Sequence, residues 1–329
     1  MIVSRTPLRI SLGGGGTDLP HYYKKYGGFV ISTAIQKYVY VIVSNHFENI
    51  IKLNYSKPEI CHHVNQIKHP IIREALKLLK LKNHIEITSL ADVPANSGLG
   101  SSGSFTVGLL NSLHSFKNKS ISRKKLAEMA THIEMNLLKA PIGKQDQYIA
   151  AFGGFTCFYI DKKGKVSIKP LNISNRTIKN LEQNLTFFYT GILRKSWSII
   201  KDQKINSQKN ESSLDSMTRI KKIGYKIKRC LENDDLDEFG VLMDEHWEAK
   251  KKTSSKISNS QIDLYYNLAK NNGALGGKLI GAGGGGFLMF YTRTLRHKQQ
   301  LIKILGNKGL KEIPMKFEPK GTKIIFKLK

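Results

Sequence analysis

Glycine, serine and a few isolated carboxylates concentrate in short segments of this chain. The clearest segment is PANSGLGSSG, from Pro94 to Gly103. Glycine lets a ligand approach the backbone, and the free N–H groups at the start of a helix favour anions. A plain turn between a strand and a helix needs the same residue types, so glycine and serine alone leave both explanations open. The segment predicts a phosphate-binding loop if a strand precedes it and a helix follows.

Other nucleotide motifs do not fit this segment. Residues 98–103 and 281–286 both satisfy G-x-G-x-x-G, which shows how weak that dinucleotide pattern is. A Rossmann unit runs its strand directly into the first glycine and carries an acid about 20 residues later, whereas Pro94 intervenes here and residues 123–125 are basic. The sequence has no G-x-x-x-x-G-K-[ST] and no H-R-D or D-F-G segment. The segment is therefore still a candidate for phosphate binding, but not in a Rossmann, P-loop or protein-kinase fold.

Two carboxylates follow the loop, Glu134 and Asp146. A glutamate on a helix is usually just solvated, but Asp146 lies among apolar and small residues, where an unpaired charge is costly. Phosphoryl transfer uses two such acids. One helps to hold Mg²⁺ against the phosphates, and the other orients or deprotonates the attacking hydroxyl.

Two more glycine runs could contact a ligand. The alternating segment from Thr6 to Leu12 leads into Gly13–Gly16 and then offers a carboxylate at Asp18. A second run, residues 281–286, precedes an apolar strand, where a simple hairpin would need only about two such residues. The excess glycine predicts contact with a ligand at both places.

The periodicity of apolar residues predicts an α+β protein with two domains. In the first half it predicts strands at 4–12, 29–35, 38–44, 50–55, 85–90, 155–160 and 166–171, and helices at 70–82, 103–116 and 122–138. In the second half it predicts a strand at 185–189, helices at 215–232, 236–250 and 261–271, strands at 278–280 and 287–291, a helix at 295–305 and a final strand pair. This order suggests a ferredoxin-like split βαβ with extra helices. The polar, turn-rich segment 174–184 divides the expected domains, 1–174 and 175–329.

Composition excludes several classes of protein. The net charge of +28 comes from lysines scattered along the chain, which we interpret as a basic surface, although a nucleic-acid-binding protein is a rival of a different class. Three widely separated cysteines and adjacent His62 and His63 give no disulfide framework and no zinc spacing. No signal peptide or membrane span is visible, so we expect a cytoplasmic enzyme without membrane or nucleic-acid partners.

In this order the three glycine segments resemble the superfamily of galactokinase, homoserine kinase, mevalonate kinase and phosphomevalonate kinase. The family motif P-x-x-x-G-L-x-S-S-A is matched from Pro94 to Ser102, with Gly103 in place of alanine, a small-for-small change that we expect to be harmless. Glu134 and Asp146 are twelve positions apart, as the metal ligand and the catalytic acid are in galactokinase-like members. The resemblance implies a first domain like ribosomal protein S5 domain 2, a ferredoxin-like second domain and ATP bound between them.

The resemblance also implies roles for residues. Asp146 would be the base, Arg9 would stabilise developing charge, and Ser102 with Glu134 would coordinate Mg²⁺. ATP and its phosphates would contact Pro94, Gly98, Leu99, Gly100, Ser101, Ser102 and Gly103. The substrate would contact Gly14, Gly15, Thr17, Asp18, Arg194, Gly284 and Gly285.

Two segments, GGGTDLP and GKQDQY, are similar to the bacterial D-glycero-D-manno-heptose 7-phosphate kinases, which phosphorylate an anomeric hydroxyl for capsule or lipopolysaccharide synthesis. The Glu-His that precedes Thr-Asp in galactokinase is glycine here, which argues against galactose. Arg194 lies in a Thr-Gly-x-x-Arg segment similar to one in the heptose kinases, and arginine suits a phosphate. A kinase of a neutral sugar such as L-fucose is the rival. The oligomeric state stays open, a homodimer included.

Overall fold

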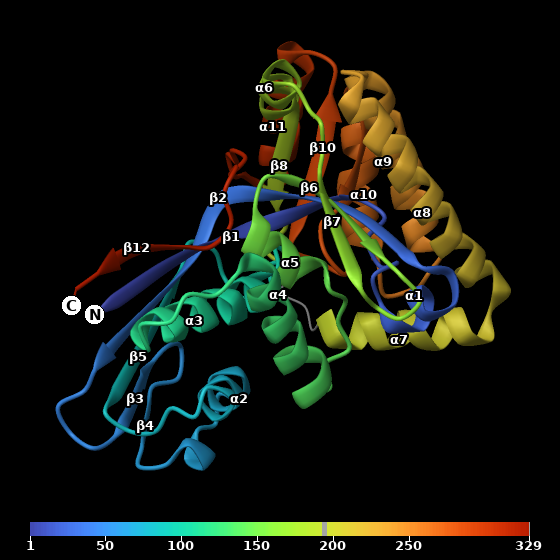
Figure 1. Ribbon diagram of the computed structural model, residues 1–329. Coiled ribbons are helices and arrows are strands. Elements are labelled where there is room, and N and C mark those ends of the chain that lie inside the picture. Colours follow the sequence, from blue (N-terminus) through green and yellow to red (C-terminus); the bar gives the residue numbers. More distant parts are fainter. Residues whose placement is uncertain (193–195, 329) are drawn as a thin grey trace.

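The computed structural model describes residues 1–192 and 196–328, which form two β-sheets with helices packed on them (Figure 1). The first sheet has the strand order β12-β1-β2-β5-β3-β4, and β6 pairs with β2 and with β7. All its pairings are antiparallel except that of β3 with β5. The strands are β1 (Ile2–Gly13), β2 (Gly28–Asn45), β3 (Ile51–Asn54), β4 (Glu59–Cys61), β5 (Ile85–Ala91), β6 (Phe155–Ile160), β7 (Val166–Pro170) and β12 (Lys323–Lys327).

The sequence predicts three helices of this first half, at 70–82, 103–116 and 122–138, but not its first and last helices. The helices are α1 (Pro20–Tyr26), α2 (Pro70–Leu78), α3 (Ser101–Phe116), α4 (Arg123–Thr131) and α5 (Gln145–Phe152), with a 3₁₀ turn at Val64–Gln66. The predicted helix 122–138 continues α4 as a π-helical segment, His132–Leu137. Such segments are frequent at functional sites, and this one carries Glu134.

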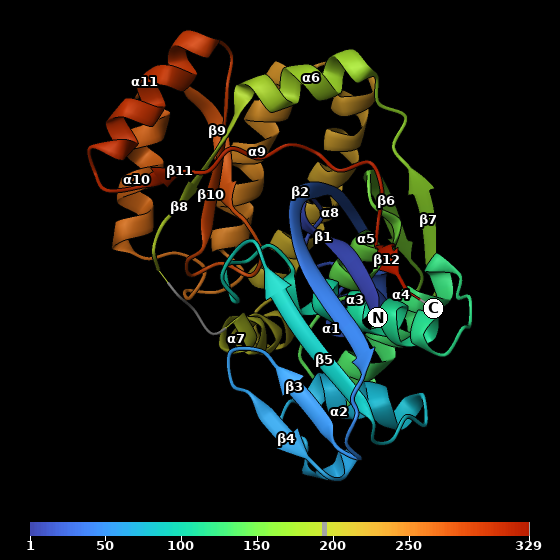
Figure 2. The same ribbon diagram turned by 90° about the vertical axis from the view of Figure 1, so that its left-hand side faces the viewer.

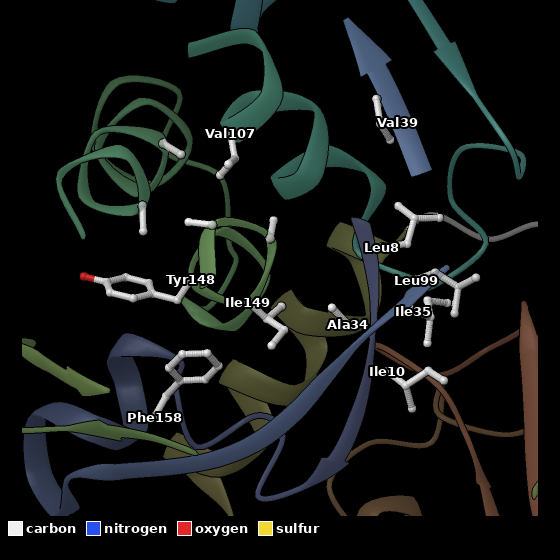
Figure 3. Packing of buried hydrophobic residues seen from close by; sticks show 14 of the residues in the cluster. Leu8, Ile10, Ala34, Ile35, Val39, Leu99, Val107, Tyr148, Ile149 and Phe158 are labelled. Atoms are coloured by element: carbon white, nitrogen blue, oxygen red, sulfur yellow. The ribbon is translucent and has the colours of Figure 1, made fainter. Parts of the chain in front are cut away.

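The buried core fixes the elements that carry the site. Side chains of β1, β2, α3 and α5 pack together, as Ile10, Ala34, Val107 and Ile149 show in Figure 3, and all four are fully buried. Leu99 also has no exposed surface and lies beside Leu8 and Ile35 in this core. The glycine loop is therefore anchored by its one large apolar side chain.

The second sheet has the order β11-β8-β10-β9. Its strands are β8 (Leu185–Tyr189), β9 (Ala274–Leu279), β10 (Phe287–Thr292) and β11 (Lys311–Glu312), and its helices are α6 (Asn175–Asn184), α7 (Ser196–Lys209), α8 (Glu211–Glu232), α9 (Leu236–Lys251), α10 (Ser260–Lys270) and α11 (Leu295–Gly306). Chain order gives strand, helices, strand pair, helix and strand, as the sequence predicts for a split βαβ. None of the described helices combines the length and apolarity needed to cross a bilayer.

Some local predictions were wrong. The turn-rich segment 174–184 is helix α6, which begins where the Ser174 side chain accepts a hydrogen bond from the Thr177 N–H. Most residues of this helix are polar and only Thr177 and Leu181 are buried, so the segment resembles a polar turn in its composition. Helices α5 and α7 were also missed, because their apolar and polar residues do not separate onto clear faces.

The two halves meet through the C-terminal segment and through α8. The Glu318 N–H donates to Ala34 O of β2, and β12 pairs with β1, so the N- and C-termini lie side by side (Figures 1 and 2). We therefore propose that the first domain contains residues 1–174 together with the chain from Met315 onward, rather than 1–174 alone. Helix α8 crosses the end of β1 closely, because a Cβ placed on Gly224 would lie 3.1 Å from the Gly14 nitrogen.

Candidate active site

A cavity lies between the two halves. The first half contributes the end of β1, the glycine loop before α3 and the start of α5. The second half contributes α7, α9, β9 and the loop that follows β9. Of the residues predicted from the sequence, the cavity is lined by Arg9, Gly15, Asp18, Gly98, Gly100, Ser101, Ser102 and Asp146. Residues from distant parts of the chain thus share one space.

Arg9 and Asp146, which both line the cavity, form a bidentate ion pair. Arg9 Nε lies 2.7 Å from Asp146 Oδ1, and Arg9 Nη2 lies 2.9 Å from Oδ2. Arg9 Nη1 donates to Gly98 O at 2.5 Å, and its backbone N–H donates to Leu99 O. A register shift between Pro7 and Leu8 in β1 precedes Arg9, and such bulges often re-aim side chains beside active sites. The pair fixes a carboxylate and a cation where they can act on one hydroxyl.

The glycine loop ends at the first turn of α3. Gly100 is the N-cap, with a left-handed φ of 80°, and a Cβ there would lie 3.0 Å from Arg9 Cγ. Ser101 Oγ is buried and has no hydrogen-bond partner among the described residues. An unpartnered hydroxyl beside the free N–H groups of a helix start is suited to a phosphate oxygen.

Glu134 lies behind this helix start. Its carboxylate accepts a hydrogen bond from Ser102 Oγ at 2.6 Å and one from Gln147 Nε2 at 2.9 Å. The side chain is buried, and burial raises the pKa of Glu134, while the hydrogen bonds from Ser102 and Gln147 oppose that rise. A buried carboxylate paired with a hydroxyl gives the hard oxygen ligands that Mg²⁺ prefers.

Asp18 also lines the cavity from the first half of the chain. Its carboxylate accepts hydrogen bonds from the N–H groups of Gln145, at 2.9 Å, and Gly16, at 3.2 Å. Burial raises the pKa of Asp18, the hydrogen bond from Gln145 opposes that rise, and the charge of Asp146 adds to it. An acid held this rigidly in a cavity is suited to binding sugar hydroxyls.

Asp18→Asn should change how stability depends on pH. Because the folded-state pKa of Asp18 is raised, the folded protein binds this proton more tightly than the unfolded chain. The acid therefore stabilises the fold at low pH, and that contribution is lost as pH rises through the raised pKa. We expect the Tm of Asp18→Asn minus that of wild type to become more positive from about pH 4 to about pH 8. Exposed Asp215→Asn is the control; parallel wild-type and Asp18→Asn profiles would contradict the assignment.

Several predicted contacts do not lie at the cavity. Pro94 is exposed, and Leu99 is buried in the core. Thr17 is fully buried, where its hydroxyl donates to Gly14 O and accepts from the Phe29 N–H, so Thr17 and Gly14 shape the turn before Asp18. These residues position the loops and do not line the cavity.

In the second glycine run, residues 281–286, substrate contact was predicted for Gly284 and Gly285, but these two glycines pack against other parts of the chain. The Gly284 N–H donates to Ile257 O, and the Gly286 N–H donates to Ile192 O. A Cβ on Gly285 would lie 2.4 Å from Ile192 O. Gly284 and Gly285 therefore pack against neighbouring backbone, and Gly281 and Ala282 reach the cavity instead. Arg194 lies outside the described residues.

Gly103 does not line the cavity but matters for packing, contrary to the expectation that alanine would be equivalent. A Cβ on Gly103 would lie 2.7 Å from Asp146 Cβ and 3.0 Å from its carbonyl carbon. We expect Gly103→Ala to lower kcat about tenfold and to destabilise the fold by about 1–3 kcal/mol. The added methyl group would push α5, which carries Asp146, away from α3. Steady-state kinetics and thermal unfolding measure both effects. Gly306→Ala, a helical glycine with open space, is the matched control. Wild-type kcat and Tm for Gly103→Ala would refute the tight contact.

The residues with which the second half lines the cavity were not predicted from the sequence. They include His246 and Lys250 of α9, Lys278 of β9, and Trp197 of α7. His246 and Lys250 are four positions apart in a predicted helix and so share one face, which was the available signal. Nothing in the sequence distinguishes Lys278 from the many other lysines scattered along the chain.

The fold and site define a two-domain kinase, and comparison with known proteins names its family. Residues 65–154 match the GHMP kinases N terminal domain, and residues 227–311 match the GHMP kinases C terminal domain. The D-glycero-alpha-D-manno-heptose 7-phosphate kinase of Campylobacter jejuni is 31% identical over 92% of this chain and 93% of its own length. The chain therefore belongs to the GHMP kinase family and is an ATP-dependent phosphotransferase.

Other relatives agree with this assignment. The galactokinase of Pyrococcus furiosus is 25% identical over 99% of this chain and 97% of its own. The crystal structure of a D-glycero-D-manno-heptose 1-phosphate kinase from Bacteroides thetaiotaomicron superposes with a TM-score of 0.83 and 25% identity over 100% of both chains. The predicted two-domain α+β fold is thereby confirmed.

Proposed function

We propose that this kinase transfers the γ-phosphate of ATP to the anomeric hydroxyl of a sugar phosphate, D-glycero-D-manno-heptose 7-phosphate, to give the 1,7-bisphosphate. The observation that carries the proposal is the Arg9–Asp146 pair, held between the phosphate-binding start of α3 and the sugar-binding Asp18. The substrate named for the Campylobacter jejuni relative, at 31% identity over 92% of the chain, supports the heptose phosphate.

In the proposed reaction the sugar hydroxyl oxygen attacks the γ-phosphorus. Asp146 orients the hydroxyl and accepts its proton, while the bond from the γ-phosphorus to the β,γ-bridging oxygen breaks and ADP leaves. Arg9 stabilises negative charge that develops on the attacking oxygen. Ser101 and the N–H groups at the start of α3 hold phosphate oxygens, and Asp18 fixes sugar hydroxyls. Positioning and electrostatics thus supply most of the catalysis.

Ser102 and Glu134 fit a Mg²⁺ ion. Among the described residues no group of three or more His, Cys, Asp or Glu side chains could hold a metal, so the nucleotide phosphates would complete the coordination. Bound there, the ion would neutralise charge on the phosphates. The hydrogen bond from Ser102 Oγ to Glu134 Oε2, 2.6 Å long, supports this proposal, because it places the two oxygen atoms side by side.

Glu134→Gln should raise the Mg²⁺ concentration needed for half-maximal activity, because an amide is a poorer ligand for a hard cation than a carboxylate. Ser102→Ala should do the same more mildly. Both should leave the KM for the sugar unchanged. Metal titrations of initial rate measure the effect, with Glu128→Gln, an exposed glutamate on α4, as the control. Titration curves that overlay the wild type would place the ion elsewhere.

Product analysis tests the proposed substrate. Purified enzyme with ATP, Mg²⁺ and heptose 7-phosphate should yield ADP and a new phosphorus NMR signal coupled to the anomeric proton. A new phosphate on another hydroxyl would overturn the anomeric assignment. Turnover of L-fucose or galactose in place of the sugar phosphate would favour the neutral-sugar kinase instead.

A further inference from the structure

Three nitrogen-bearing side chains gather on the second-domain wall of the cavity. His246 and Lys250 come from one face of α9, and Lys278 comes from β9, against which α9 packs (Figure 2). All three line the cavity yet are buried, with 2% of His246, 9% of Lys250 and 2% of Lys278 exposed. Basic groups this deeply buried require a structural or functional reason, because burying charge is costly.

The contacts of the three side chains differ. Lys278 Nζ donates to Leu12 O at 2.8 Å, directly before the glycine run that leads to Asp18. Lys250 Nζ donates to Leu279 O at 3.1 Å and to Gly281 O at 2.6 Å. Neither ring nitrogen of His246 has a hydrogen-bond partner among the described residues. A buried imidazole with two unused nitrogens in a cavity wall indicates a ligand that the protein itself does not supply.

The charges around the cluster favour an anion. Burial lowers the pKa of His246, and the charges of Lys278 and Lys250 lower it further. Burial likewise lowers the pKa of Lys278, with added effects from Lys250 and Arg9. The charged neighbours that act on both groups are therefore cations. A bound dianion would compensate them and would accept several hydrogen bonds.

We propose that His246, Lys250 and Lys278 form the site for the phosphate group that the sugar substrate already carries. The inference rests on the proposed function, since it assigns the second phosphate of a sugar-phosphate kinase. The nucleotide phosphates have their own place at the start of α3, on the first-domain wall, where Ser101 is available. The cluster comes from α9 and β9 of the second half, and Lys278 Nζ donates to Leu12 O, just before the glycine run that leads to Asp18. A sugar phosphate can thus be held at both ends while its hydroxyl faces Asp146.

The test compares a phosphorylated sugar with the same sugar after removal of its phosphate. His246→Gln and Lys278→Met should each raise the KM for heptose 7-phosphate about 10- to 100-fold, the range for losing a hydrogen bond to a charged group. The kcat/KM for dephosphorylated heptose and the KM for ATP should stay within about threefold of wild type, a change of less than 1 kcal/mol. Lys298→Met, which removes a lysine bonded to Gln183 O and Leu185 O away from the cavity, should leave all values unchanged.

Three outcomes would overturn the inference. An equal loss of kcat/KM with both sugars would mean that the cluster does not bind the sugar's phosphate. A raised KM for ATP would assign the cluster to nucleotide binding. His246→Gln breaks no side-chain hydrogen bond to any residue that the structure describes, so it tests the idea even if Lys278→Met fails to fold. Inorganic phosphate should compete with heptose 7-phosphate in the wild type and more weakly in His246→Gln. A wild-type enzyme without preference for the phosphorylated sugar would refute the proposed function, whereas variants that keep a wild-type preference would refute only this site.

Discussion

Asp146→Asn should lower kcat by about 10²–10⁴ while ATP binding and folding stay close to wild type, because a positioned base contributes that range. The amide keeps the shape of the carboxylate but cannot accept the proton of the sugar hydroxyl. Its NH₂ group would also face the Arg9 guanidinium, which donates to both oxygens of Asp146. Single-turnover rates with saturating ATP isolate the chemical step.

The control for Asp146→Asn is another arginine–aspartate pair in the same chain. Arg293 Nε lies 2.7 Å from Asp237 Oδ2 on the exposed surface of the second domain. Asp237→Asn should leave kcat unchanged, since exposed pairs contribute little. If Asp146→Asn retained wild-type kcat, Asp146 could not be the base, whatever its geometry.

Arg9→Met should lower kcat by about 10²–10³, the usual loss when one charge-stabilising donor is removed. Methionine keeps the apolar stem that packs beside Gly100 but removes the bonds to Asp146 and Gly98. The KM for ATP should change less than kcat, because the helix start that holds the phosphates is untouched. Arg293→Met is the matched control, with no expected loss.

A double mutant shows whether Arg9 and Asp146 act together. Since the two side chains are in direct contact, their effects should not add. Arg9→Met should therefore cost much less in the Asp146→Asn background than in the wild type. Additive losses in kcat would mean that the two residues contribute independently and that their contact is only structural.

Part of the cavity lining could be predicted from the sequence, because short segments of the chain carry it. The segment 94–103 follows β5 and runs into the first turn of α3, between a strand and a helix as predicted, and Ser101 and Ser102 line the cavity. Arg9 and Asp146 were assigned separately. Their contact joins positions 137 residues apart, which depends on how β1 and α5 pack. Pairings over such distances arise from the whole fold rather than from a local pattern.

The glycines wrongly expected to contact a ligand or to be replaceable share a cause, since glycine serves packing as well as ligand binding. Gly285 and Gly103 lie where a Cβ would meet neighbouring atoms at 2.4 Å and 2.7 Å. A glycine required for close packing and one required for ligand contact look the same in a sequence. Only the atoms around the glycine in the folded structure distinguish the two. His246 was missed for the opposite reason, because one histidine in an amphipathic helix is ordinarily a core or surface residue.

The most direct test of the account is the ratio of kcat/KM for heptose 7-phosphate to that for dephosphorylated heptose, measured by ADP release with ATP and Mg²⁺. We expect the phosphorylated sugar to be preferred by about 10- to 100-fold or more, given what hydrogen bonds to a charged group contribute. ADP release with either sugar should fall with Asp146→Asn. A ratio near one or below, or ADP release that Asp146→Asn leaves intact, would contradict a sugar-phosphate kinase built on this site.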